Sequence, residues 1–248
     1  MTDRFLQSFM LQNWEDLLLL HWPVDKIELG QTIPDDLEID TFEGQAWLSV
    51  VGFRLSGLRI KPVSWIPWPS FWEINLRTYV KDKQGKKGVW FYSLDSSDIF
   101  AVLGARLMYG LPYNLSVTEG SVSSKRITFR SRRKLPHARA RSEFGASFAP
   151  IQSDTEFSGS TLAHFLLERY RFWSRRKWGA VSTSARVRHT PYQAVRAQDI
   201  HYKGELFSSQ GIAEPTQEAT LGHYCGGLKV HASAPSWAFS IAGQANHK

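Results

Sequence analysis

FWEINLRTYV, residues 71–80, places Glu73, Asn75, Arg77 and Tyr79 at alternating positions. The residues between them are mostly apolar, namely Ile74, Leu76, Thr78 and Val80. Such alternation is typical of a β-strand, in which successive side chains point to opposite faces and same-face neighbours lie about 7 Å apart. The pattern predicts a strand with a carboxylate, an amide, a guanidinium and a phenol in one row. That row is ordinary if it meets solvent, and it is a binding site if it lines a cavity.

Most of the remaining chain is also expected to be β-structure. Residues 14–22 read as a buried strand. Hairpins are expected where polar or Gly-containing turns separate strand-like runs, and a loop or lid is expected where prolines prevent ladder pairing. The expected hairpins span residues 37–55, 71–95 and 115–133, and the first has its turn at Glu43-Gly44. Further strands are expected at residues 138–148, 180–189 and 225–233. The Pro/Trp-rich loop spans residues 61–70.

Two helices interrupt the strands. The first has helical apolar spacing after residues 95–97, whose side-chain oxygens are N-cap candidates, and it is expected to end at Gly110. The second is expected over residues 161–173, capped by the Ser/Thr/Asp-rich stretch 152–160. Arg106 falls in the first helix.

Length and composition predict one folded domain over residues 1–248, with short flexible termini. Hydrophobic residues make up 42% of the chain, which is enough for a core. A single cysteine, Cys225, excludes an internal disulfide and suits a reducing compartment. Neither a leader pattern nor a long apolar run is present, so a cytoplasmic protein with no membrane span is expected.

The net charge of +7 is concentrated in the second half of the chain. Residues 1–119 hold 11 Lys+Arg against 15 Asp+Glu, whereas residues 120–248 hold 19 against 8. The segments 125–141 and 169–188 contain no acid and could contact a polyanion such as a nucleic acid. Solvated surface is the more common role of such residues, and no nucleic-acid-binding motif accompanies them.

Familiar cofactor and catalytic motifs are absent from the sequence. It contains no Walker-type loop, no GxGxxG and no GxSxG. None of the eight histidines forms HxxxH or HExxH, and His21, His189 and His201 could converge only through tertiary folding. The expectation is therefore no cofactor and no metal.

Several segments carry a family resemblance. The runs LLLLHWPVD (17–25), LEIDTFEGQAWLSVVGFRLSG (37–57), EINLRTYV (73–80), GVWFYSLD (88–95), ARLMYGLPY (105–113) and FLLERYRFW (165–173) resemble, in this order, the YqjF-like family DUF2071. The resemblance covers about residues 14–232. The family is uncharacterised, and it is placed in the acetoacetate decarboxylase-like superfamily. That placement implies a mainly β fold: a closed, cone-shaped, mostly antiparallel β-barrel with a few flanking helices and a central cavity.

The resemblance also bears on whether acetoacetate-type decarboxylation is expected. The decarboxylases carry their Schiff-base lysine in a Gly-Phe-Pro-Lys-Lys segment, and Gly110-Leu111-Pro112-Tyr113-Asn114 stands at the similar place here. A tyrosine and an asparagine cannot form the iminium on which that decarboxylation depends. The activity is therefore expected to be absent unless Lys61, Lys203 or Lys229 enters the cavity. Glu73 matches a glutamate on a similar strand of the decarboxylases.

The resulting hypothesis is a barrel cavity that binds a small organic anion, possibly with lysine-independent chemistry. Candidate ligand-binding residues are Glu73, Asn75, Arg77, Tyr79, Tyr113 and His21, with Arg77 for carboxylate recognition and Glu73 as a general base or a buried ion-pair partner. Each of them could instead serve only the core, and Arg169 and Tyr170 could anchor the second helix to the barrel. The alternatives are a nucleic-acid or polyanion module on the basic surface, and a partner-binding scaffold that uses Trp65 and Trp68. A homo-oligomer is compatible with any of these.

Overall fold

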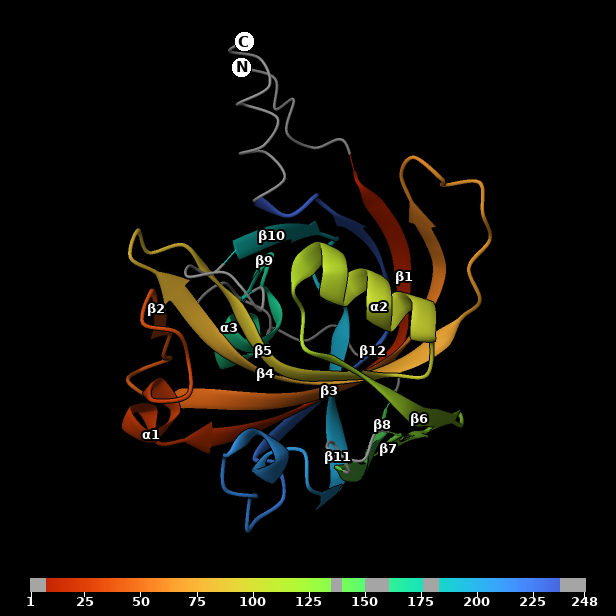
Figure 1. Ribbon diagram of the computed structural model, residues 1–248. Helices are drawn as coiled ribbons and strands as arrows, with labels where there is room; N and C mark the ends of the chain where they lie inside the picture. The colour runs from red at the N-terminus through yellow and green to blue at the C-terminus, as the bar shows by residue number, and fades with distance from the viewer. Residues whose placement is uncertain (1–7, 135–139, 150–160, 176–182, 237–248) are drawn as a thin grey trace.

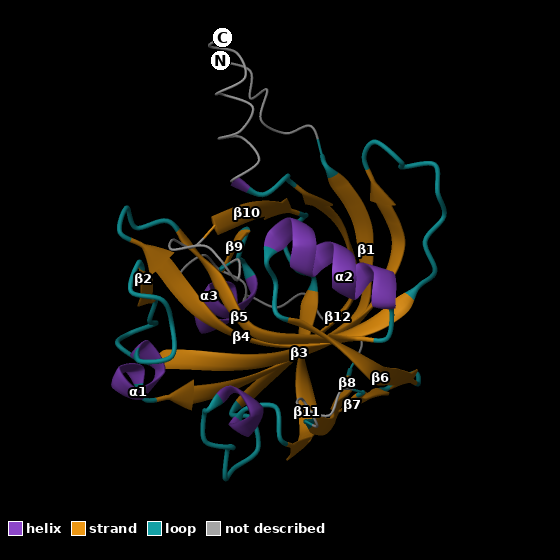
Figure 2. Cartoon of the chain, viewed as in Figure 1, coloured by secondary structure: helices purple, strands orange, loops and turns teal. Residues whose placement is uncertain are grey.

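The computed structural model describes residues 8–134, 140–149, 161–175 and 183–236. Strands dominate these ranges, and the few helices lie outside or across the sheet (Figure 2). The strands are β1 Met10–Val24, β2 Leu37–Ile39, β3 Ala46–Ile60, β4 Phe71–Asp82, β5 Lys87–Ser96, β6 Tyr113–Val122, β7 Arg126–Arg133, β8 Arg141–Phe148, β9 Arg171–Ser174, β10 Thr183–Arg188, β11 Ala194–Gly204 and β12 Leu221–Ala232. The helices are α1 Lys26–Gly30, α2 Ile99–Tyr109, α3 Leu162–Leu167 and a short 3₁₀ turn, Ser208–Gln210.

The strand pairings close two rings that share a wall (Figure 1). The shared wall is β12-β1-β3-β4-β5. One ring, called the β9–β10 ring, closes through β9 and β10, because β9 pairs with β5 and β10 pairs with β12. The other, called the β6–β8 ring, closes through β6, β7, β8 and β11. Almost all pairings are antiparallel, so the expected closed, mainly antiparallel barrel is confirmed.

The shared wall explains why β4 is buried on both faces. Its even-numbered side chains, among them Ile74 and Leu76, pack with Phe129 and Phe144 inside the β6–β8 ring. Its odd-numbered side chains point into the β9–β10 ring, where Tyr79 packs with Phe165 and Val89. The polar row of residues 73–79 therefore faces a barrel interior and not solvent.

Close packing in the β6–β8 ring requires a glycine in the shared wall. The aromatic side chains of Phe129 and Phe144 stack with centroids 5.2 Å apart, and both lie against Gly52 of β3. A Cβ atom at residue 52 would lie 2.7 Å from the Phe129 ring. The apolar side chains around Phe129 and Phe144 are buried, and globular cores are usually close-packed.

The aliphatic face of β4 packs beneath a second layer of strands. The β7–β8 hairpin covers it, through Ile127, Phe129 and Phe144. The physical reason is that a hairpin with one apolar face can bury a sheet as efficiently as a helix can.

The helix expectations are partly wrong. Helix α2 begins after Asp98, whose carboxylate accepts a hydrogen bond from the Ala101 amide, while Asp95 is a buried strand residue. Gly110 ends α2 in a left-handed conformation, as expected. The second helix is only α3, capped by Thr161, and the chain then becomes strand β9. Its proposed cap, 152–160, lies outside the described residues.

The first expected hairpin is also partly wrong. The turn at Glu43-Gly44 exists, with positive φ at both residues and reciprocal backbone hydrogen bonds between Phe42 and Gln45. However, β2 does not pair with β3 as a hairpin would require, and it pairs instead with the end of β4. The hairpins 71–95 and 115–133 and the strands at 14–22, 138–148, 180–189 and 225–233 are confirmed within the described residues.

Candidate functional site

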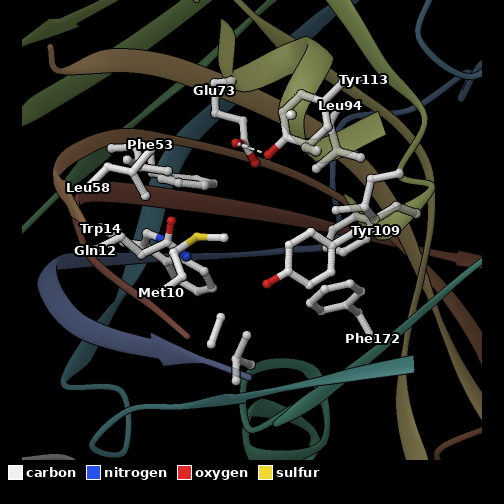
Figure 3. A pocket seen from close by; sticks show the side chains of 18 of the residues that line it. Met10, Gln12, Trp14, Phe53, Leu58, Glu73, Leu94, Tyr109, Tyr113 and Phe172 are labelled. Atoms are coloured by element: carbon white, nitrogen blue, oxygen red, sulfur yellow. Dashed lines mark hydrogen bonds between the residues drawn. The ribbon is translucent and has the colours of Figure 1, made fainter. Parts of the chain in front are cut away.

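A cavity of about 150 Å³ lies inside the β9–β10 ring. Most of its wall is apolar, and Figure 3 shows side chains from β1, β3, β5 and α2 converging on it. Helix α2 closes one side, with Ala101, Gly104 and Met108 in the lining. Polar groups enter the wall at a few places, chiefly Glu73, Arg77 and Tyr113.

Glu73 and Tyr113 form a hydrogen-bonded pair at the cavity wall (Figure 3). The Tyr113 hydroxyl donates to Glu73 Oε2 at 2.6 Å, and Asn75 Nδ2 approaches Oε1 at 3.4 Å. Burial raises the pKa of Glu73 to about 7, although both hydrogen bonds oppose this shift. Burial and the neighbouring carboxylate raise the pKa of Tyr113 well above its usual value. Glu73 can therefore change protonation state near neutral pH, and Tyr113 stays protonated.

Arg77 is buried without a carboxylate partner among the described residues. It is 6% exposed, its Nη2 lies 3.4 Å from the Leu166 carbonyl oxygen, and its Nε has no hydrogen bond. Its guanidinium carbon also lies 6.0 Å from the centroid of the Tyr79 ring. A buried cation normally has an anionic partner because desolvation of an unpaired charge costs several kcal/mol. No acidic side chain of the described residues neutralises the buried Arg77 guanidinium.

Tyr79 and His21 belong to a polar network next to the cavity. The Tyr79 hydroxyl lies 2.6 Å from Ser49 Oγ, which lies 2.7 Å from His21 Nδ1, and His21 Nε2 lies 3.2 Å from His223 Nδ1. Burial, with His223 next in importance, lowers the pKa of His21 well below its usual value, so the imidazole is neutral. Tyr79, His21 and Asn75 share the polar side of the wall but are outside the cavity lining.

Sequence reasoning missed several lining residues. Arg169 lines the cavity and pairs with the buried Asp40 at 2.7 Å, while its Nε donates to the Phe165 carbonyl oxygen. This is the anchoring role expected for Arg169, although the residue follows α3 and does not lie within it. The first residues of β1, Met10–Trp14, also contribute side chains to the cavity lining, and no local feature of the sequence indicated this. Only the ring closure brings it beside α2.

No lysine lines this cavity within the described residues. Lys61, Lys203 and Lys229 are exposed. Tyr113, whose hydroxyl donates to Glu73, contributes a phenol to the lining. Among the described residues the lining therefore holds a carboxyl and phenol pair and no lysine.

No metal cluster occurs among the described residues. No group of three or more His, Cys, Asp or Glu side chains converges there, and His21 meets His223 instead of His189 or His201. Within the same residues, none of the helices has the length and apolar character needed to cross a membrane.

Part of the basic segment 125–141 is already paired. Arg133 forms a buried ion pair with Asp95 at 2.8 Å, and Arg130 pairs with Glu143 at 3.0 Å on the surface. These contacts reduce the positive charge that the segment can offer to a polyanion.

Several solved structures share this fold. The chain superimposes on acetoacetate decarboxylase from Legionella pneumophila with a TM-score of 0.63 at 12% identity, covering 92% of this chain and 87% of that one. An acetoacetate decarboxylase-like enzyme from Sphingomonas wittichii RW1 gives 0.60 at 11%, covering 93% and 94%. The enduracididine biosynthesis enzyme MppR, in complex with pyruvate, gives 0.62 at 10%, covering 94% and 92%. At these identities the likeness establishes the fold alone.

Comparison of sequences finds a relative at higher identity than these structures. The chain is 35% identical over 234 residues to the uncharacterized protein YqjF of Bacillus subtilis (strain 168), covering 90% of this chain and 94% of the relative. The model of the DUF2071 family, described as an uncharacterized conserved protein, matches residues 11–229. The match agrees with the extent expected from the motifs in the sequence. The chain therefore belongs to the DUF2071 family.

Proposed function

We propose that the cavity of the β9–β10 ring binds a small organic acid, with the ligand carboxylate paired to Arg77. The observation that carries this proposal is the buried guanidinium without an anionic partner among the described residues. Its planar fork of donors matches a carboxylate, and the surrounding apolar wall would strengthen the pair by excluding water.

The Glu73–Tyr113 pair supplies a second polar group in the same cavity. Glu73 has a pKa of about 7, so it can accept or give a proton near neutral pH. This is the capacity that lysine-independent acid–base chemistry on a bound acid would need. Iminium chemistry is not part of the proposal, because the described lining contains no lysine.

The likeness to a protein that holds pyruvate supports a carboxylate as ligand without specifying which one. The basic surface is a weaker site for function because Arg130 and Arg133 are already paired. Nucleic-acid binding remains an outcome that the same experiment can detect.

The test is a thermal-shift and calorimetric screen of small keto-acids, hydroxy-acids and aromatic acids. A ligand at one hundred times its Kd should stabilise the native protein by about 2.7 kcal/mol. Arg77→Gln should abolish this stabilisation. Arg188→Gln, which removes an exposed charge outside the cavity, should not change it. Equal binding by wild type and Arg77→Gln would refute the assignment, and salt-sensitive stabilisation by short DNA or RNA alone would move the function to the surface.

A further inference from the structure

Helix α2 presents an apolar face that no described residue covers. Ile99, Phe100, Leu103 and Leu107 are 48%, 70%, 55% and 71% exposed. At about 100° per residue these four side chains share one sector of the helix. A helix that is apolar on nearly all sides is normally buried, so this face requires an explanation.

The neighbouring sector of α2 forms the wall of the cavity. Ala101, Gly104, Ala105 and Met108 line it, and the first three are small. Phe100 belongs to both sectors, because it lines the cavity and is largely exposed. The apolar surface is therefore continuous from the cavity interior to the outer face of the helix.

The 61–70 loop, whose base lies beside the start of α2, also exposes apolar side chains. Val63, Trp65 and Ile66 are 40%, 74% and 46% exposed. Trp68 lines the cavity and its indole N–H donates to Asp98, the N-cap of α2, at 3.3 Å. The base of the loop is thus tied to the start of the helix beside the cavity.

These exposed residues together are called the apolar rim. They account for seven of the twelve exposed large apolar side chains in the described part of the chain, so most of this exposure falls in two segments that meet at the Trp68–Asp98 hydrogen bond. The rim consists of Val63, Trp65, Ile66, Ile99, Phe100, Leu103 and Leu107.

We propose that the ligand is an amphiphilic acid, with its carboxylate at Arg77 and an alkyl or aryl-alkyl tail that leaves the cavity over the apolar rim. This inference rests on the proposed function and names its ligand class. A cavity of about 150 Å³ holds a body the size of benzene, so a longer tail must emerge. Phe100 gives the tail an unbroken apolar path to the rim. A protein partner could cover the rim, but it would not account for the continuity with a cavity that contains a buried guanidinium.

The experiment measures Kd for straight-chain carboxylates from butanoate to dodecanoate, below their micelle concentrations. Affinity should rise about two- to fourfold per methylene beyond the length that fills the cavity. The double variant Leu103→Ser/Leu107→Ser should lose most of this rise and keep the wild-type Kd for butanoate. Ile27→Ser, on α1 and 75% exposed in the wild type, is the matched control and should leave the whole series unchanged. Alkylamines of equal length, which lack the carboxylate, should bind more weakly at every length.

Three outcomes would overturn the inference. Short acids that bind with no dependence on chain length would leave the proposed function standing and remove the amphiphilic class. Failure of every acid to bind would remove both. A double variant that turns a dimer into a monomer in sedimentation, with an unchanged chain-length series, would make the rim an interface between copies. Leu107→Ser alone provides the same test if the double variant is unstable.

Discussion

The two ring interiors are separated only by the shared wall, yet they are filled in opposite ways. The β6–β8 interior contains stacked aromatics pressed against Gly52. The β9–β10 interior contains a cavity with Glu73 and Arg77 in its wall. One strand, β4, supplies side chains to both. The difference teaches that close packing on the aliphatic side of the wall can compensate for poorly solvated polar groups on the other side.

Two buried arginines, Arg133 in the β6–β8 interior and Arg77 in the β9–β10 interior, differ in their pairing. Arg133, on the β6–β8 side, has Asp95 as its ion-pair partner, and Asp95 accepts a further hydrogen bond from Ser131. Arg77, on the cavity side, has no ion-pair partner within the described residues. The Arg133 guanidinium has its carboxylate partner within the fold, although its Nη2 makes no hydrogen bond to a described residue. The Arg77 guanidinium has no such carboxylate among the described residues, so an added anion would gain more there than at Arg133.

The largest expected effect comes from making a void in the packed interior. Phe129→Ala should lower the free energy of unfolding by about 3–5 kcal/mol, because it removes a fully buried ring with little room for collapse. Phe53→Ala, which enlarges an existing cavity, should cost less than about 3 kcal/mol. Urea unfolding of both variants measures the difference. Equal costs would show that the two interiors are packed alike.

The next comparison tests the two arginines. Asp95→Asn should cost about 3–5 kcal/mol, because it leaves the Arg133 guanidinium buried and unpaired. Arg77→Gln should leave stability unchanged or raise it, because it removes a charge that has no carboxylate partner. Thermal unfolding without added acids is the measurement. A loss of stability in Arg77→Gln as large as in Asp95→Asn would mean that Arg77 serves the fold.

Glu73 should make stability depend on pH. Its pKa is about 7 in the folded protein and near 4.5 when unfolded, so the native state binds more protons between these values. Its contribution is fully present below about pH 4.5 and is lost as pH rises through 7, a change of about 3 kcal/mol at most. Glu73→Gln should abolish this slope. Glu38→Gln, a change at an exposed carboxylate, is the control and should retain it.

The smallest effect is expected at Tyr113. Its hydroxyl lowers the pKa of Glu73, so Tyr113→Phe should raise that pKa further, by about one unit for one lost hydrogen bond. Titration of the Glu73 carboxyl by ¹³C NMR would measure the shift. An unchanged titration would show that water replaces the phenol and that the pair is not a functional unit.

Much of the fold could be predicted because its signals are local. Alternation in residues 71–80 predicted β4, and Gly110 predicted the end of α2. The length of the second helix is not predictable, because the apolar spacing of residues 161–173 suits a short helix followed by a strand equally well. The sequence also does not locate the N-cap of α2, because several adjacent polar residues could serve and only the structure shows that Asp95 is buried and that Asp98 caps the helix.

The candidate site was less predictable because its members come from distant parts of the chain. The polar row gave Glu73 and Arg77, but nothing local marked Met10–Trp14 or Arg169 as parts of the same wall. Their proximity depends on β10 pairing with β12 and β9 pairing with β5, which are contacts between distant segments.

The sequence by itself determined which side chains share a face, because the backbone of a strand imposes a period of two. It also determined that Tyr113 and Asn114, and not lysines, directly follow Pro112. Only the tertiary structure decided which face lines a cavity, that Tyr113 meets Glu73 across 40 positions of chain, and that Arg77 is buried without an acidic partner among the described residues. The reason is that burial and pairing depend on ring closure, and closure is a property of all the strands together.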